Sequence, residues 1–344
     1  MVSQIWAVHN RFALAGGRQP GGVNFDGAIL LANGGFFTRA EALRDGASDR
    51  SLRSALRQGE IVRLRQGCYA PKPEFDELDE TARHLLLARA VLASQRGKVA
   101  LAGPSAALLH GFAVWGHDLS VVHLLRCDKG PGRREAGIVH HVAKHPKRMG
   151  LGTYGGVLAV RPEQAVWQVA CLSTLESAVV TADSALHEQP DLIEPLRELA
   201  GQQRTHPRSR TGRLAVSLAR PEAESPGESL TRMACYRHGI PSPTLQYEVI
   251  DDDGVVLGRA DFYWEECRHL AEFDGRVKYE RYRLPGESIN DCVLREKGRE
   301  DAMRGTLRGM SRLVFVQVVP GRTGPGMAAL RRDLDRSKRL YVRV

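Results

Sequence analysis

The sequence of 344 residues predicts an α/β protein with several domains. Three observations lead to this fold class. The chain exceeds the ~250–300 residues that one hydrophobic core usually serves. Two short capped helices followed by a basic hairpin predict a winged helix-turn-helix near the N-terminus, and helices alternate with apolar strands through the rest of the chain. We therefore expect an N-terminal winged helix, a mixed α/β middle domain and a C-terminal α/β sandwich.

The composition is that of a globular protein, because 42% of the residues are hydrophobic and 26% are charged. The six cysteines are scattered without a CxxC pair, which predicts free thiols rather than a zinc site or disulfides. No apolar run approaches the ~20 residues that span a bilayer, and the N-terminal stretch lacks the apolar middle of a signal peptide. We expect a cytoplasmic protein without membrane contact.

The net charge of +9 is unevenly distributed over five expected segments. They are an arm with a first helix (1–31), the winged helix (32–72), the middle domain (73–200), a basic linker (201–224) and the last domain (225–344). Positive charge is concentrated in the winged helix, the linker and the last domain, while the middle domain has a slight acidic excess. This distribution favours contact between those three parts and a polyanion.

Residues 34–71 carry local signals for two helices and a hairpin. Thr38 followed by Glu41 is a capping box that begins the first helix. Ser48 or Asp49 caps the second helix. The second helix has apolar residues at the spacing of one buried face, namely Leu52, Ala55 and Leu56. The stretch EIVRLRQGCYAP then alternates apolar and basic residues around a Gln-Gly turn, which predicts the wing.

The basic side chains left outside this module are the candidate DNA contacts. They are Arg50, Arg53 and Arg57 on the second helix, with Arg63 and Arg65 on the hairpin. A winged helix of this kind places its second helix in the major groove and its wing on the phosphates. The alternatives are an ordinary solvated basic face, or a winged helix that contacts protein.

The stretch from Gly34 to Pro71 resembles the N-terminal domain of AbiEi-type antitoxins of abortive-infection systems, and PSAALLHGF in the middle region resembles the same family. The resemblance implies double-stranded DNA as a ligand and a cognate toxin or defence-system protein as a partner. It also implies a middle region related to nucleotidyltransferases. The sequence lacks a Gly-Ser followed by the paired aspartates that would hold a nucleotide and metal, so nucleotidyl transfer is not expected.

The middle domain alternates helices and strands. We expect a helix over ARHLLLARAVLASQ, strands at VALAG, VVHLL, GIVHHV and GVLAV, and helices beginning near Pro104, Pro162 and Thr174. His140, His141 and His145 fall within six residues, but neighbouring residues of a strand point to opposite faces, so His140 and His141 cannot share one metal without distortion. We assign these histidines no chemistry. The basic linker is expected to contain a short helix in its middle.

The last domain is expected to begin with a helix that Ser225 caps and Pro226 enters. The stretches LQYEVID, GRADFYW and HLAEFDG then form an antiparallel meander. A helix over DCVLREKGREDAMRG and a strand over RLVFVQVV complete the α/β sandwich.

Four carboxylates in this domain stand where a metal-dependent phosphodiesterase needs them: Glu228, Asp261, Glu272 and Asp274. Glu272 and Asp274 share one face of a strand, and like charges so close repel unless something positive lies between them. Mg²⁺ or Mn²⁺ prefers oxygen ligands and meets this need. The alternatives are a solvated strand end for Glu272 and Asp274, and a simple helix cap for Glu228.

Residues ~222–320 resemble the very-short-patch-repair-like branch of the PD-(D/E)xK nucleases, which have a restriction-endonuclease-like fold, in ESPGESLTR, GRADFYW, EFDGRVKY and REKGREDAMRG. The resemblance implies that Asp261 and Glu272 bind the metal, with Asp274 beside them, and that Glu228 is the helical acid of the site. The family's lysine would stand at Asp274, and Lys278 is the substitute. Lys297, Arg299 and Arg304 share a helix with acidic residues, where local ion pairs are the default, and one of them is a candidate contact to the scissile phosphate.

These observations predict a DNA-binding, Mg²⁺-dependent endonuclease in phage defence or a toxin–antitoxin system. Its expected catalytic residues are Glu228, Asp261, Glu272, Asp274 and Lys278, its metal ligands Asp261, Glu272 and Asp274, and its phosphate contacts include Lys297 and Arg304. The alternative is a non-catalytic AbiEi-like transcriptional regulator or antitoxin that uses the nuclease fold to bind DNA or a partner. The sequence leaves the oligomeric state open.

Overall fold

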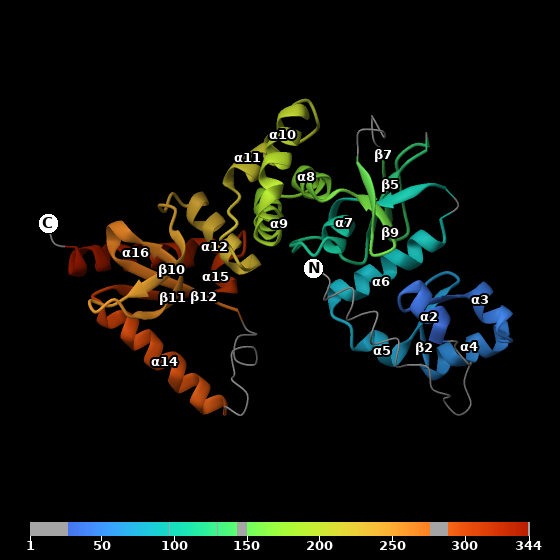
Figure 1. Cartoon of the computed structure of the whole chain (residues 1–344), viewed down its shortest axis with the longest axis horizontal. Helices are drawn as coiled ribbons and strands as arrows, with labels where there is room; N and C mark the ends of the chain where they lie inside the picture. Colours follow the sequence, from blue (N-terminus) through green and yellow to red (C-terminus); the bar gives the residue numbers. More distant parts are fainter. Residues whose placement is uncertain (1–26, 96, 129, 143–149, 276–287, 343–344) are drawn as a thin grey trace. The chain divides into compact units, whose positions relative to one another are not determined.

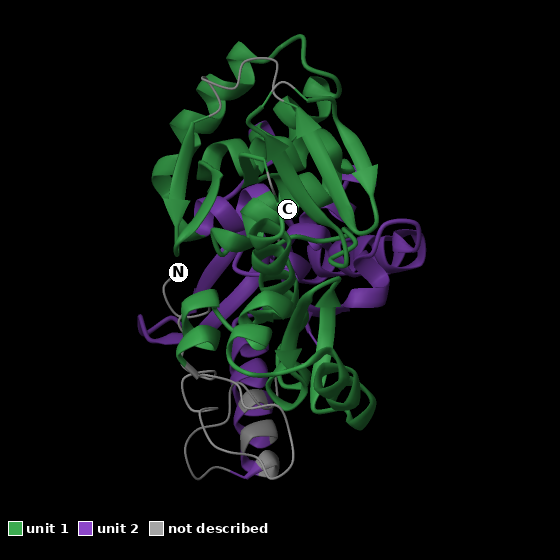
Figure 2. Cartoon of the chain, turned by 90° about the vertical axis from the view of Figure 1, so that its right-hand side faces the viewer, with its two compact units in different colours: residues 1–181, 188–216 green, residues 182–187, 217–344 purple. Residues whose placement is uncertain are grey.

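The structure, a computed structural model, describes residues 27–95, 97–128, 130–142, 150–275 and 288–342 (Figure 1). The chain forms two compact units, which Figure 2 colours separately. The first unit comprises residues 1–181 and 188–216, and the second comprises residues 182–187 and 217–344. Most of the N-terminal arm, His145 and Lys278 fall outside the described residues.

The N-terminal part of the first unit has the element order of a winged helix. It consists of α2 (Gly27–Asn33), β1 (Phe37–Thr38), α3 (Arg39–Arg44), α4 (Asp49–Gln58), β2 (Ile61–Arg65) and β3 (Cys68–Pro71). The three strands form one sheet in the order β1-β3-β2, with antiparallel neighbours. The two helices and the hairpin that the sequence predicts are therefore present.

Short local signals begin and end the helices of this module. Thr38 is the N-cap of α3 and forms a capping box with Glu41, as predicted. Ser48, one of the two expected residues, is the N-cap of α4 and pairs with Ser51. Gly59 ends α4 in the left-handed conformation that glycine adopts without steric cost. The apolar face of α4 is buried, because Leu52 and Ala55 lie in the core.

A second apolar cluster joins the winged helix to the elements that follow it. Phe36, Cys68 and Ala70 pack against Leu86 and Ala90 of the helix α6 (Glu80–Ala93). The short helix α5 (Lys72–Asp76) lies between β3 and α6 in the chain. This shared core explains why the winged helix and the middle region belong to one compact unit.

The middle region is built on a six-stranded mixed sheet in the order β6-β7-β5-β4-β9-β8. Its strands are β4 (Val99–Leu101), β5 (Val122–Arg126), β6 (Arg133–Glu135), β7 (Ile138–Val142), β8 (Leu151–Tyr154) and β9 (Val157–Val160). The neighbours β5/β7 and β4/β9 are parallel, and the others are antiparallel. The four predicted strands are present, and two edge strands, β6 and β8, were not predicted.

Helices complete the middle region. They are α7 (Gly103–Leu109), α8 (Pro162–Leu172), α9 (Leu175–Glu188), the 3₁₀ turn η2 (Pro190–Leu192), α10 (Ile193–Gln202) and α11 (Ser209–Leu218). The helices expected near Pro104, Pro162 and Thr174 are therefore confirmed. The expected linker 201–224 contains α11, where the sequence indicates a short helix. Ala215 and Val216 of α11 are buried, so this segment is packed.

The second unit contains a four-stranded sheet in the order β10-β11-β12-β13. Its elements are α12 (Pro226–Arg237), β10 (Thr244–Ile250), β11 (Val256–Trp264), η3 (Glu265–Cys267), β12 (His269–Asp274), α14 (Ile289–Gly305), β13 (Gly309–Val314), α15 (Phe315–Val318) and α16 (Thr323–Tyr341). β10, β11 and β12 form the predicted antiparallel meander, and β13 runs parallel to β12. The element order matches the expected α/β sandwich.

One predicted strand is too long. The sequence predicts a strand over residues 312–319, but β13 ends at Val314 and Phe315–Val318 form the helix α15. The side-chain oxygen of Gln317 accepts a hydrogen bond from the backbone N–H of Val314 at 2.9 Å, which closes the first turn of α15. A side chain competing for a backbone donor ends the strand.

Helices cover both faces of the four-stranded sheet (Figure 1). His269 and Phe273 point to one face, where His269 contacts Ser337 of α16 and the Phe273 ring lies against Gly227 of α12. Leu270 points to the other face and packs in a cluster with Met303 of α14. Alternation along β12 therefore assigns Glu272 and Asp274 to the face that α14 covers.

A buried ion pair holds α12 in the second unit. Arg232 of α12 donates to the carboxylate of Asp183 at 2.7 Å, and the side chains are 7% and 0% exposed. Asp183 also accepts the backbone N–H of Arg220, and Arg232 donates to the Leu218 carbonyl oxygen. Although α9 begins in the first unit, its residues 182–187 therefore belong to the second.

Two further expectations concern cysteines and membranes. All five cysteines whose side chains the structure describes are free thiols, as expected. Within the described ranges, no helix combines the length and the apolar character that crossing a bilayer requires.

Candidate functional site

The exposed surface of α4 is basic. Arg50, Arg53 and Arg57 are all exposed, while Leu52 and Ala55 face the core. The helical spacing thus separates a buried apolar stripe from a solvent-facing basic one. This is the surface that a winged helix presents to the major groove and to phosphates.

An ion pair fixes the orientation of α4 relative to α3. The Nε and Nη2 atoms of Arg39 donate to the two carboxylate oxygens of Asp49, at 2.7 Å and 2.6 Å. The hydrogen bond from Arg39 lowers the pKa of Asp49. Arg53 also donates to the backbone oxygen of Asp49, at 3.1 Å. A two-pronged contact sets geometry as well as attraction, so the first residue of the helix that carries the candidate DNA contacts is tied to the first residue of α3.

The two arginines of the wing lie in different environments. Arg63 is exposed and borders a cavity of about 230 Å³ that Arg83 and His84 of α6 also line. Arg65 is half-buried, and its Nε and Nη1 atoms are enclosed without a hydrogen-bond partner among the described residues. The register shifts between Arg63 and Arg65, because these residues pair with the adjacent residues Tyr69 and Cys68. The sequence predicts that Arg63 and Arg65 both contact phosphate, because strict alternation would place them on the same face of β2. The extra residue in β2 interrupts that alternation.

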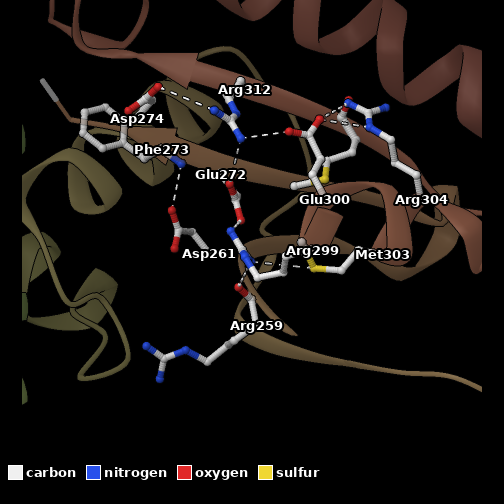
Figure 3. Close-up of polar contacts among 11 residues, drawn as sticks. Arg259, Asp261, Glu272, Phe273, Asp274, Arg299, Glu300, Met303, Arg304 and Arg312 are labelled. Atoms are coloured by element: carbon white, nitrogen blue, oxygen red, sulfur yellow. Dashed lines mark hydrogen bonds and ion pairs between the residues drawn. The ribbon is translucent and has the colours of Figure 1, made fainter. Parts of the chain in front are cut away.

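Acidic residues of the second unit come together with arginines at the end of β12, where Figure 3 shows Asp261, Glu272, Asp274 and Glu300. Glu272 is buried, and Arg299 of α14 donates to one of its oxygens at 2.7 Å. Arg312 of β13 lies 3.7 Å from the other oxygen of Glu272 and 3.9 Å from Asp274. The positive charge between Glu272 and Asp274 in this structure is therefore a guanidinium group.

The guanidinium of Arg312 is shared with a further acidic residue. It donates to Glu300 of α14 at 2.8 Å, and Glu300 also accepts from Arg304 at 2.7 Å. The predicted local ion pair of Arg304 is thus confirmed. Lys297 is exposed on the same helix. These ion pairs do not test whether Lys297 or Arg304 contacts phosphate. That role remains a prediction for both residues.

Asp261 lies close to a further carboxylate, that of Glu228 on α12. Asp261 accepts the backbone N–H of Phe273 at 2.8 Å, which fixes its carboxylate beside β12. Burial raises the pKa of Glu228, and the negative charge of Asp261 raises it further. The two carboxylates are therefore close enough to repel.

Glu228 is also a helix cap, as the alternative interpretation holds. It accepts from the Ser225 hydroxyl at 2.7 Å and from the backbone N–H of Glu224 at 3.0 Å. A third donor is the amide of Gln246 at 2.7 Å. Gln246 has a φ of +50°, which is costly for a residue with a side chain. The strained backbone of β10 thus delivers a donor to Glu228 beside Asp261.

The residues present fit a divalent cation only in part. Mg²⁺ and Mn²⁺ are held by one or two carboxylates together with water and phosphate. Glu228 and Asp261 provide such oxygens, and their repulsion would be relieved by a cation. Glu272 is already neutralised by Arg299 and Arg312. Among the described residues, no group of three or more His, Cys, Asp or Glu side chains is arranged to hold a metal ion.

Sequence reasoning did not predict how Glu272 is neutralised. Arg299 was expected to pair along its own helix, yet its partner lies on β12. Arg312 was not singled out at all. The parallel register aligns Arg312 with Glu272. This pairing depends on the tertiary structure, because it requires β13 to lie beside β12.

Comparisons with known proteins place the N-terminal module in a class. Residues 28–72 match a family model described as transcriptional regulator, AbiEi antitoxin. This range covers α2 to β3 and so coincides with the winged helix. The predicted resemblance of this module to AbiEi antitoxins is confirmed for these residues.

Two relatives extend along most of the chain. The uncharacterized proteins MT2308 and Rv2248, from the CDC 1551 / Oshkosh and H37Rv strains of Mycobacterium tuberculosis, are each 28% identical to this chain over 288 residues. The match covers 82% of this chain and 96% of each relative. Among solved structures, the crystal structure of the RV2827C protein from Mycobacterium tuberculosis matches with a TM-score of 0.35 and 15% identity, over 63% of this chain and 83% of that chain.

Proposed function

We propose that this protein is a DNA-binding transcriptional regulator of the antitoxin class, with the winged helix as its docking element. One observation carries the proposal: the capped helix α4 presents Arg50, Arg53 and Arg57 to solvent in a module that matches the AbiEi regulator model. Contacts to phosphate position such a module on the duplex. A cognate toxin or defence-system protein is the protein partner that this class implies.

Salt-dependent binding tests this proposal. Each phosphate contact that is lost reduces the slope of log affinity against log salt by about 0.9. Arg53→Ala combined with Arg63→Ala should therefore weaken binding to a DNA duplex and flatten the slope by about 2. Arg197→Ala is the matched control, since Arg197 is exposed in the same unit and pairs with Glu194 on α10. Unchanged affinity and slope in the double variant would contradict the proposal.

A second candidate function is metal-dependent hydrolysis of phosphodiesters in the second unit. The observation that favours it is the closeness of the Glu228 and Asp261 carboxylates in a domain with the predicted element order. A bound Mg²⁺ would activate water and stabilise charge on the phosphate. Asp261 and Glu228 would hold the cation, Glu272 would complete its ligands, and Arg299 and Arg312 would hold phosphate oxygens.

Cleavage assays test this second function. Supercoiled, linear, mismatched and single-stranded DNA would be incubated with the protein in Mg²⁺, Mn²⁺ or EDTA. We expect metal-dependent cleavage that Asp261→Asn abolishes, and a loss of roughly a hundredfold in Lys278→Met if that lysine contacts the transition state. No cleavage of any DNA form by the wild type would leave the regulator as the function of the whole chain.

A further inference from the structure

We infer that the second unit binds DNA phosphates through an arginine ridge on α16, formed by Arg332, Arg336 and Arg339. This surface would serve the same ligand as the winged helix, so the inference rests on the proposed function and deepens it. The ridge is distinct from the acidic site at the end of β12 and from the phosphate contacts predicted on α14.

The positive charge of the last domain is concentrated in α16. Five basic and two acidic residues give this helix a net charge of +3, and the rest of residues 225–344 is neutral. The excess of positive charge is therefore carried by 19 residues rather than spread over the domain. Such a concentration creates a local positive potential that attracts a polyanion.

The spacing of the three arginines places them on one face of α16. Arg332, Arg336 and Arg339 follow one another at intervals of four and three residues, which is the repeat of a helical face. Leu330 and Leu334 lie on the opposite face and are buried. The core thus fixes the orientation of the helix, and the arginine ridge points directly away from it.

The three arginines of the ridge are exposed and have no partner among the described residues. The charged neighbours Arg331 and Asp333 are engaged elsewhere. Arg331 donates to the backbone oxygen of His238. Asp333 accepts from the hydroxyl of Ser311 on β13, at 2.8 Å. These contacts draw the two neighbouring side chains towards the rest of the unit and away from the ridge.

Asp335 is the acid best placed to neutralise the ridge. It stands three residues after Arg332 and four before Arg339, the spacing at which ion pairs form along a helix. Neither arginine forms an ion pair with it in the part of the chain that the structure describes. Burial raises the pKa of the Cys267 thiol on η3, and the nearby charges of Lys338 and Asp335 shift it in opposite directions. Asp335 therefore lies near η3, and phosphate can approach the ridge without breaking an ion pair.

A DNA backbone fits the ridge better than a protein surface does. Protein interfaces are built around apolar and aromatic anchors. Within α16, all of which the structure describes, the one large apolar side chain that is exposed is Leu340. The ridge spans about 10 Å of the helix axis, and each DNA strand presents a phosphate about every 3.4 Å along the duplex axis. The planar forks of the three arginines can therefore contact successive phosphates.

The sheet separates the ridge from the carboxylates of the acidic site. His269 points to the face of β12 that α16 covers, where it contacts Ser337. Glu272 points to the other face, where it contacts Arg299 of α14. Phosphates bound at the ridge therefore do not meet the repulsion of those carboxylates at close range.

Binding of a labelled DNA duplex to the full chain, measured by fluorescence anisotropy over a range of salt concentrations, tests the inference. The ridge variant combines Arg332→Ala, Arg336→Ala and Arg339→Ala. It should bind roughly tenfold or more weakly at low salt, and the slope of log affinity against log salt should fall by about 2 to 3. Alanine favours the helical conformation, so urea unfolding of the second unit should be unchanged.

A matched control separates a local contact from the effect of overall charge. It replaces three exposed arginines of the first unit by alanine, Arg133, Arg161 and Arg197, each of which pairs with a glutamate. This variant loses the same net charge as the ridge variant, yet it should bind DNA nearly as the wild type does. Adding Arg53→Ala and Arg63→Ala to the ridge variant should lower the slope further, by about 2.

Two outcomes would overturn the inference. The first is equal affinity and slope in the ridge variant and the wild type, which would leave the ridge as a solvated face or a contact for protein. The second is an equal loss in the ridge variant and its control. Weaker binding in the Arg53→Ala, Arg63→Ala variant together with the first outcome would keep the proposed function and remove only the ridge. The reverse pattern would keep the ridge and remove the winged helix as the docking element.

Discussion

The buried pair of Asp183 and Arg232 offers a sharp test of how the second unit is held together. The replacement Asp183→Asn keeps the size of the side chain and leaves the charge of Arg232 in a place where it is only 7% exposed. Breaking a buried ion pair in this way costs about 3–5 kcal/mol, because the remaining charge stays buried without a partner. Since domains are stable by about 5–15 kcal/mol, this loss is a large fraction of the total.

The same geometry predicts that removing both charges is far less harmful. Burial raises the pKa of the Asp183 carboxyl, and the charge of Arg232 opposes that rise. Desolvation thus offsets much of the attraction, and apolar replacements of buried ion pairs are often neutral. The double variant Asp183→Asn with Arg232→Met should therefore be more stable than Asp183→Asn alone, by about 1–3 kcal/mol.

Urea unfolding followed by the fluorescence of Trp264, a buried residue of the second unit, measures these differences. Because Glu228 lies one turn before Arg232 on α12, the Asp183→Asn variant should also lose order at the acidic site. The reasoning is refuted if Asp183→Asn lowers the free energy of unfolding by less than about 1 kcal/mol. It is also refuted if the losses of Asp183→Asn and Arg232→Met, measured separately, simply add in the double variant.

Three further predictions concern a cap, a histidine and a glycine. Thr38→Ala should lower the free energy of unfolding of the first unit by about 1 kcal/mol, since it removes the acceptor at the start of α3. Burial, assisted by His141, lowers the pKa of His123 to about 3, so the unfolded chain binds a proton below pH 6.5 that the folded chain refuses. This contribution to stability is complete above pH 6.5 and is lost as the pH falls towards 3. We therefore expect the free energy of unfolding to fall by about 1 kcal/mol between pH 7 and pH 5.5. The His123→Gln variant should show a shallower pH dependence. Gly227→Ala should cost about 1–3 kcal/mol, because a Cβ there would lie 2.0 Å from the ring of Phe273.

Each of these predictions has a control measured by the same chemical unfolding. Thr38→Ser keeps the capping oxygen and should retain most of the stability. His206→Gln, at an exposed position, should leave the pH dependence unchanged. Gly201→Ala meets no atom within 4 Å and should be tolerated. Equal effects of a variant and its control would contradict the corresponding explanation.

Much of the fold could be predicted because its signals are local. The capping box at Thr38 and the cap at Ser48 involve residues within one helical turn, so their spacing in the sequence is already their spacing in space. The buried strands of the middle region carry runs of apolar residues that read as strands in any context. β6 was missed because all three of its residues are exposed, and an edge strand without an apolar face leaves no pattern.

The candidate site was predicted only as far as its acids. The sequence by itself determined that Asp261 and Glu272 lie on adjacent strands and that Glu228 begins a helix, since these follow from strand alternation and helix capping. Only the tertiary structure decided what neutralises Glu272, because Arg299 and Arg312 reach it from α14 and from a parallel strand. The placement of strands side by side sets their register, bulges such as the one before Arg65, and the ion pairs between elements. No periodicity along the chain encodes that placement.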